Sequence, residues 1–259
     1  MMLHKPARDA RVKLFGIQVD AISMETAVQR IYGWMTQATG NCKYVVTPNV
    51  DHVVRLREHQ SFRLAYRDAA LVVADGLPLV LASRWLGKPV PERVAGSDLI
   101  PELFAAADQH GPIKVFLLGA APGVAGRAAE RIESTWPAVH VTGFNSPPLG
   151  FENQEHLNQS ILDHIRRAKP DLLVLGLGAP KQELWVHAHR NRIDAGVAVC
   201  AGGTIDFLAG EKQRAPRWAR KAGLEWCHRL LSEPRRLARR YAGNAWTFPR
   251  LLWQEWRRS

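Results

Sequence analysis

The protein is a chain of 259 residues, of which 46% are hydrophobic and 23% are charged, and its formal net charge is +11. This size and composition predict one α/β domain with a sizeable core and a small appendage. The chain has no run of about twenty apolar residues and residues 1–11 have no apolar signal segment, so we expect a cytoplasmic protein without a transmembrane helix.

The first part of the chain predicts a mixture of strands and helices. Residues 13–22 suggest an opening strand or hairpin, and Ser23 is a suitable N-cap for the helix behind it. The elements expected next are a helix at 26–35, a strand at 43–47, a helical region at 50–59 that continues through 62–68, a strand at 71–74, a helix at 78–86 and a helix opening at 97–98.

From residue 113 onward, strands and helices alternate regularly. The expected strands are residues 113–118, 139–143, 171–175 and 196–200, and the expected helices between them are residues 124–134 and 157–168. Strands that alternate with helices form a parallel sheet with helices on both faces. We therefore predict an α/β core over residues 1–210.

Residues 211–259 form a basic tail with a different composition. They contain 13 Lys or Arg, 4 Asp or Glu, and five of the nine tryptophans. Apolar residues occur near helical spacing, and Pro234 predicts the start of a second helix. A basic amphipathic helix with tryptophans favours an anionic membrane surface. Nucleic-acid binding, which the tryptophans favour less, and a merely solvated basic face are the alternatives.

Each predicted strand ends in a polar or glycine-rich turn. These turns are residues 47–49, 75–76, 119–123, 178–182 and 202–206. Because ligands bind outside the carboxyl ends of parallel strands, the turns are expected to meet at one edge of the sheet. Asp75, at the end of a buried strand, could accept a proton from a substrate hydroxyl there. Its alternative role is to shape a turn or to cap the next helix.

The segment GAAPGVAG, which begins at Gly119, follows a strand and opens a helix. Backbone N–H groups at such a helix start can hold a phosphate, although plain packing explains the glycines equally well. The spacing differs from G-x-G-x-x-G, and no acidic residue follows the next predicted strand. A dinucleotide-dependent oxidoreductase is therefore disfavoured.

No metal motif is present in the sequence. There is no Walker A sequence, no H-E-x-x-H and no D-x-D pair, and His187 and His189 would lie on different faces of a helix. Cys42, Cys200 and Cys227 are isolated, so neither a disulfide framework nor a zinc site is indicated. We expect a metal-free site in which Arg or Lys neutralises any leaving diphosphate.

Six segments together resemble the WecG/TagA/CpsF family of bacterial glycosyltransferases. They are TPNVDHVV at 47–54, ADGLPLV at 74–80, ERVAGSDLIPEL at 92–103, GAPKQELW at 178–185, GGTIDFLAG at 202–210 and RAPRWARKAGLEWCHRLLSEPRRLARRY at 214–241. The segments keep the family's order, which makes the resemblance specific. It extends from residue 13 to residue 241, and the residues beyond are the least covered.

The resemblance implies a Rossmann-like, inverting, metal-independent enzyme without a cofactor. Such an enzyme transfers a sugar from a UDP-sugar donor to a polyprenyl-diphosphate-linked sugar acceptor at the cytoplasmic membrane face. It serves cell-surface polysaccharide synthesis or the synthesis of a teichoic acid linkage. With the basic tail, this implies a peripheral membrane protein whose appendage, residues 211–259, completes the active site.

The resemblance also implies roles for single residues. Asp75 corresponds to the catalytic aspartate, Thr47 and Asn49 to residues that contact the donor sugar or the acceptor, and Arg93 to a loop arginine. On the donor side, Gln182 lies near the nucleotide sugar and Asp206 binds its ribose. The appendage arginines correspond to Arg229, Arg236 and Arg239, which would stabilise diphosphate charge.

Two rival functions belong to other classes. One is a soluble nucleotide-dependent oxidoreductase, and the other is a nucleic-acid-binding module that uses the basic tail. Under the leading interpretation no nucleic-acid partner is expected. The sequence leaves open which sugar is transferred, and it is compatible with a homo-oligomer.

Overall fold

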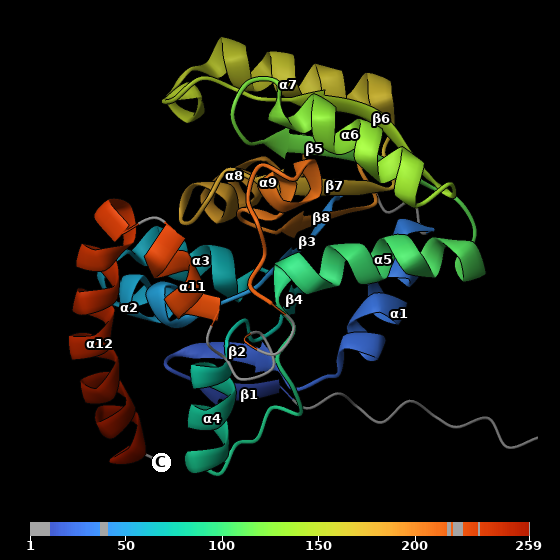
Figure 1. Ribbon diagram of the computed structural model, residues 1–259. Coiled ribbons are helices and arrows are strands. Elements are labelled where there is room, and N and C mark those ends of the chain that lie inside the picture. Colours follow the sequence, from blue (N-terminus) through green and yellow to red (C-terminus); the bar gives the residue numbers. More distant parts are fainter. Residues whose placement is uncertain (1–10, 37–40, 217–218, 220–224, 233, 259) are drawn as a thin grey trace, which may run out of the picture.

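The computed structural model describes residues 11–36, 41–216, 219, 225–232 and 234–258. Its centre is a parallel sheet of six strands in the order β4-β3-β8-β7-β5-β6 (Figure 1). These strands are β3 (Lys43–Val46), β4 (Leu71–Val72), β5 (Ile113–Gly119), β6 (Val139–Asn145), β7 (Leu172–Gly176) and β8 (Val197–Cys200). The prediction of a parallel sheet is confirmed.

Helices cover both faces of the sheet, as predicted. One face carries α1 (Met24–Met35), α5 (Gly96–His110), α6 (Val124–Thr135) and α9 (Thr204–Ala209). The other carries α2 (Val50–Glu58), α3 (Gln60–Arg67), α4 (Leu77–Trp85), α7 (Glu155–Ala168), α8 (Lys181–His189), the 3₁₀ turn η1 (Phe151–Asn153), and an antiparallel hairpin of β1 (Arg11–Leu14) and β2 (Ile17–Asp20). Strand residues alternate between the faces: Tyr44 and Val46 pack on one side and Val45 on the other.

Several element boundaries differ from the sequence prediction. The helical region at 50–68 is two helices, because His59 has an extended backbone (φ −119°, ψ 107°) that separates α2 from α3. Only two residues of the predicted strand 71–74 form β4. Residues 181–189 and 204–209, which the sequence presents as the continuation of turns, fold into α8 and α9 after glycine- or proline-rich starts that hide their helical pattern.

The tail forms α11 (Glu225–Ser232) and α12 (Pro234–Trp256), so the predicted helix start at Pro234 is confirmed. Leu251 of α12 is buried in the hydrophobic cluster of the α2 face, and the ring of Phe248 lies 5.4 Å from the ring of Phe15. Glu255 accepts a hydrogen bond from the backbone N–H of Phe15 at 3.2 Å. The long tail helix therefore packs against the hairpin and α2 (Figure 1). The functional division at residue 210 remains a prediction.

No helix among the residues that the structure describes has the length and apolar character needed to cross a membrane.

Candidate active site

A cleft of about 1070 Å³ lies at the carboxyl edge of the sheet. One wall consists of the turns that follow β3, β4, β7 and β8. The opposite wall consists of α11, α12 and residues 211–213 after α9. The core supplies polar turns and the tail supplies a mixed surface of aromatic, polar, charged and aliphatic side chains, so the site is built from both parts of the chain.

Asp75 reaches this cleft because backbone hydrogen bonding continues beyond the ends of two strands. Val73 N–H donates to the Val46 carbonyl at 3.1 Å, and Asp75 N–H donates to the Pro48 carbonyl at 2.8 Å. Gly76 then turns the chain with φ +112°, a conformation that side-chain-bearing residues rarely adopt. The Asp75 side chain is 28% exposed, so its carboxylate is accessible to a molecule in the cleft.

Thr47 and Asn49 hold the neighbouring turn in place. The buried Thr47 hydroxyl donates to the Cys200 carbonyl at 3.2 Å, which fastens the end of β3 to the end of β8. The Asn49 side chain caps α2 by accepting a hydrogen bond from His52 N–H at 3.3 Å. Both residues line the cleft while also fixing its shape.

Arg93 lines the cleft at the centre of a cluster of acidic side chains. Its Nη1 lies 3.9 Å from an Asp75 carboxylate oxygen and 3.2 Å from Glu225 Oε2 of α11. Its Nη2 donates to Asp98 in the first turn of α5, and Asp98 also accepts from Arg214 at 2.7 Å. A backbone hydrogen bond from Val94 N–H to the Ala74 carbonyl brings this loop beside Asp75. The cluster links the core, the loop and the tail.

Gln182 lines the cleft beside a buried carboxyl group. Its side-chain oxygen accepts from Gly202 N–H at 3.2 Å, and its Nε2 donates to Glu183 Oε1 at 2.8 Å. Glu183 is fully buried, and its other oxygen has no hydrogen-bond partner among the described residues. Burial raises the pKa of the Glu183 carboxyl to about 7, although the Gln182 hydrogen bond and the charge of Arg55 act in the opposite direction.

Asp206 lies in the first turn of α9, beside the turn formed by Gly202 and Gly203. Its carboxylate pairs with Lys212 Nζ at 3.1 Å, and its side chain is 21% exposed. Asp206 and Lys212 both line the cleft. A carboxylate in such a position can accept hydrogen bonds from the hydroxyl groups of a ligand.

Six of the predicted site residues meet in the cleft. They are Thr47, Asn49, Asp75, Arg93, Gln182 and Asp206. They come from five separate turns, loops or helix starts. The expectation that the turns meet at one edge of the sheet is confirmed for residues 47–49, 75–76, 178–182 and 202–206, and Arg93 joins them from a loop outside that set.

The other predicted site residues are placed differently. Gly119 is not among the described residues that line the cleft; an added Cβ there would lie 2.5 Å from the Gly176 backbone, so close strand packing requires this glycine. Arg239 is exposed and is likewise not in the described lining. Arg229 and Arg236 belong to α11 and α12, but their side chains lie outside the described part of the structure.

Several residues of the site escaped the sequence analysis. Asp98 and Arg214 flank Arg93, and Asp98 could have been found from its place in the same ERVAGSDLIPEL segment. Glu225 and Asn244 contribute from the tail; Asn244 donates to Asp51 at 3.3 Å. No local pattern marks Asn244, because its partner lies 193 residues away in the sequence.

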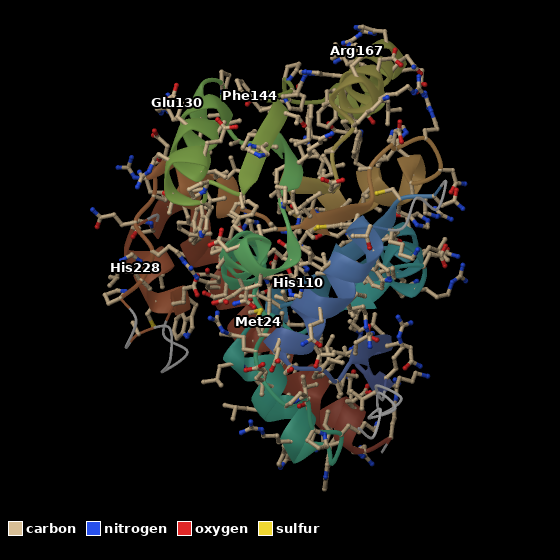
Figure 2. The ribbon with its side chains drawn as sticks, turned by 90° about the vertical axis from the view of Figure 1, so that its right-hand side faces the viewer. Met24, His110, Glu130, Phe144, Arg167 and His228 are labelled. Atoms are coloured by element: carbon tan, nitrogen blue, oxygen red, sulfur yellow. The ribbon has the colours of Figure 1, made fainter. Side chains whose placement is uncertain are left out.

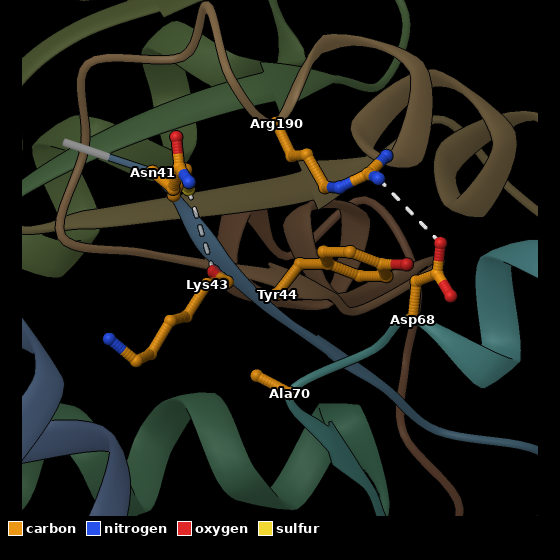
Figure 3. Close-up of a pocket in the computed structure, with 7 residues that line it drawn as sticks. Asn41, Lys43, Tyr44, Asp68, Ala70 and Arg190 are labelled. Atoms are coloured by element: carbon orange, nitrogen blue, oxygen red, sulfur yellow. Dashed lines mark hydrogen bonds and ion pairs between the residues drawn. The ribbon is translucent and has the colours of Figure 1, made fainter. Parts of the chain in front are cut away.

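A smaller cavity of about 300 Å³ lies near the opposite end of β3 (Figure 3). Lys43 and Tyr44 at the start of that strand line it, together with Asp68 and Arg190, whose side chains form an ion pair at 3.6 Å. Six of the predicted site residues line the large cleft, and none of the predicted site residues is in the described lining of this cavity.

The described residues contain no group of three or more His, Cys, Asp or Glu side chains placed to hold a metal ion. The cleft does combine an accessible carboxylate, Asp75, with a nearby guanidinium, Arg93. A carboxylate can accept a proton from a hydroxyl group, and a guanidinium can bind a phosphate oxygen. The arrangement is therefore suited to proton abstraction next to an anionic group.

Comparisons with known proteins identify the family of the chain. Residues 12–259 match the glycosyl transferase WecG/TagA/CpsF family. N-acetylglucosaminyldiphosphoundecaprenol N-acetyl-beta-D-mannosaminyltransferases from Staphylococcus aureus strains MW2, COL and MRSA252 are each 30% identical to the chain over 239 residues. The alignments cover 92% of this chain and 91% of each relative. The chain is therefore a glycosyltransferase that belongs to the WecG/TagA/CpsF family.

Proposed function

We propose that the enzyme inverts configuration without a metal and moves a sugar from a UDP-sugar to a polyprenyl-diphosphate-linked sugar at the cytoplasmic membrane face. The observation that carries the proposal is the accessible Asp75 carboxylate beside Arg93 in a cleft between core and tail. The names of the Staphylococcus aureus relatives support the acceptor class, since they specify an N-acetylglucosaminyl group on diphosphoundecaprenol.

The proposed reaction is a single displacement with Asp75 as general base. The acceptor hydroxyl attacks the anomeric carbon of the donor sugar and gives its proton to Asp75. The new glycosidic bond forms as the bond between that carbon and the diphosphate oxygen breaks, and UDP leaves from the opposite face. General-base assistance of this kind contributes about 10²–10⁴-fold to the rate.

The remaining site residues take supporting roles in this proposal. Gln182 and Asp206 bind the donor, with Asp206 on the ribose, and Thr47 and Asn49 contact the donor sugar or acceptor. Arg93, with Arg229, Arg236 and Arg239 of the tail, stabilises diphosphate charge in place of a metal. The lining of the cleft supports five of these roles, because it includes Gln182, Asp206, Thr47, Asn49 and Arg93.

The experiment is a transfer assay with a panel of UDP-sugars and a short-chain polyprenyl-diphosphate N-acetylglucosamine as acceptor. The donors include UDP-glucose, UDP-N-acetylmannosamine and the corresponding uronic acid, and each reaction is run with and without EDTA. We expect transfer of one sugar with inversion and an unchanged rate in EDTA. No transfer from any donor would contradict the proposed reaction, and complete loss of rate in EDTA would contradict metal independence.

Product formation would place the enzyme in cell-surface polysaccharide or teichoic acid linkage synthesis. The two rival functions have their own signatures. An oxidoreductase would be stabilised by NAD and not by UDP, and a nucleic-acid-binding module would bind oligonucleotides with a steep salt dependence.

A further inference from the structure

The outward face of α12 carries a stripe of alternating tryptophan and arginine. Trp246, Arg250 and Trp253 follow one another at helical spacing on that face, and Arg257, directly after the helix, continues the stripe. The Arg250 guanidinium lies 4.2 Å from the Trp246 ring centre, and that of Arg257 lies 4.7 Å from the Trp253 ring centre. Trp246 and Trp253 are 68% and 52% exposed. The apolar rings are therefore open to solvent and accompanied by positive charge.

The opposite face of the same helix packs against the rest of the protein. Asn244, Phe248, Leu251 and Glu255 follow one another at the same helical spacing and contact α2, the hairpin or the hydrophobic core. Internal packing therefore accounts for one face of α12 and leaves the tryptophan stripe unexplained.

A second element, in the core, continues this exposed surface. Leu81 and Trp85 lie one turn apart on α4 and are 51% and 55% exposed. The Trp85 ring stacks on the ring of Trp256, with centres 5.8 Å apart, so α4 and the end of α12 lie side by side (Figure 1). We call Leu81, Trp85, Trp246, Trp253 and Trp256 together the tryptophan face.

The helices that carry the tryptophan face also border the active-site cleft. Leu77 and Pro78 at the start of α4 line it, as do Phe248 and Pro249 in the middle of α12. A surface that binds the tryptophan face would therefore lie next to the cleft.

The exposed charged side chains of α4 and α12 are basic. α4 contains no acidic residue, and Glu255, the only acid in α12, is turned to the backbone of Phe15. Arg84, Arg250, Arg257 and Arg258 are exposed nearby. Aromatic rings beside arginine suit the boundary between lipid headgroups and acyl chains, where tryptophan is enriched and cations meet anionic lipid.

We propose that the tryptophan face docks on an anionic lipid bilayer and that α4 of the core, with Leu81 and Trp85, is an anchor in addition to the tail. The inference rests on the proposed function, because docking is useful to the enzyme if it brings a lipid-linked acceptor to the cleft. It goes further by assigning membrane contact to an element outside the basic tail, and by fixing which side of the molecule meets the lipid.

The test is co-sedimentation of the full chain with vesicles of phosphatidylcholine that contain a minority of phosphatidylglycerol. The double variant Leu81→Ser/Trp85→Ser removes the anchor on α4 and leaves the tail unchanged. We expect its apparent affinity for the vesicles to fall by about tenfold or more, because two half-exposed apolar side chains no longer enter the interface. Its thermal stabilisation by UDP should match that of the wild type, which shows that the cleft is intact.

The matched control is Leu149→Ser. Leu149 is 94% exposed and follows β6, at the edge of the sheet farthest from β4. Figures 1 and 2 place β6 and its residue Phe144 at the opposite end of the molecule from α4. This control should bind vesicles like the wild type.

Two results would overturn the assignment of α4. One is a double variant that binds the vesicles as tightly as the wild type. The other is equal loss of binding in the Leu149→Ser control, which would mean that any exposed leucine contributes. If light scattering showed that the double variant converts a dimer to a monomer without a change in vesicle binding, the face would be a contact between two copies and the proposal would be wrong. Vesicle binding with no transfer from any UDP-sugar would instead count against the proposed function alone.

Discussion

Asp75 lies where two strands continue their hydrogen bonding past the end of the sheet, and its partly exposed side chain lines the cleft. In the proposed mechanism, Asp75→Asn keeps the shape of the side chain and removes its ability to accept the proton. We expect turnover to fall by about a hundredfold or more while stability and UDP binding are retained. Steady-state transfer assays, with thermal shifts in UDP, measure both effects. Near-normal turnover would remove Asp75 from the role of base.

Glu183 is a fully buried carboxyl group whose ionisation should affect stability. Its pKa of about 7 exceeds the ordinary value of 4.5, so the folded protein retains a proton that the unfolded chain releases between these values. This contribution to the free energy of unfolding is fully present below about pH 4.5 and is lost as pH rises through about 7, to a total of about 3 kcal/mol at most. Glu183→Gln removes the ionisation.

Urea unfolding across this pH range tests the prediction. The wild-type free energy of unfolding should fall with rising pH more steeply than that of Glu183→Gln, while the exposed Glu102→Gln should follow the wild type. The titratable or charged groups that interact with Glu183 are Tyr66, Cys200 and Arg55, and all three are kept in the variant. Parallel curves for wild type and Glu183→Gln would show that the buried carboxyl does not titrate in this range.

At the scale of elements, α11 is fastened to the core by the ion pair between Glu225 and Arg93. Glu225 pairs with the guanidinium of Arg93, which would bind diphosphate in the proposed mechanism. Glu225→Gln should therefore tighten UDP binding by about threefold to tenfold, because Arg93 is no longer paired with a full negative charge. Asp98→Asn should weaken UDP binding instead, since Asp98 holds both Arg93 and Arg214 in position.

Isothermal titration with UDP measures the opposite changes in affinity that are expected for Glu225→Gln in α11 and Asp98→Asn in α5. Asp163→Asn on α7 is the matched control: it removes an exposed ion pair with Arg166 that is not part of the cleft. It should leave UDP affinity unchanged. If Glu225→Gln left UDP affinity unchanged or lowered it, Glu225 would not be a competitor for Arg93.

At the scale of the whole molecule, the tail closes one side of the cleft and also covers part of the core. Truncation after Gly210 removes α11 and α12 but leaves Gln182, Asp206 and Asp75. We expect little transfer activity because the wall opposite Asp75 is lost, and a lower melting temperature because Leu251 no longer fills the α2 side of the core. Transfer assays and calorimetry measure these effects.

Truncation after Trp256 is the control, since it shortens the chain and keeps both tail helices complete. Its activity on a short-chain acceptor should match that of the full chain. Full activity in the chain that ends at Gly210 would show that the tail does not complete the site.

The sequence by itself determined the class of fold and the edge of the sheet where the site lies. Alternating apolar segments fix strands and helices locally, and parallel strands must present their carboxyl ends together, so Thr47, Asp75 and Gln182 could be assigned to one edge. The resemblance of several segments in order indicated the family. Element boundaries were less certain where glycine and proline precede short helices, as at α8 and α9.

Only the tertiary structure decided which distant side chains meet. Arg93 and Glu225 are 132 residues apart, and Trp85 stacks on Trp256 across the boundary between core and tail. Hydrophobic periodicity in the sequence identifies the apolar face of a helix. Which element contacts that face depends on how all the elements pack together. The sequence therefore identified the basic, tryptophan-rich tail, and packing determined that its outer face joins α4 beside the cleft.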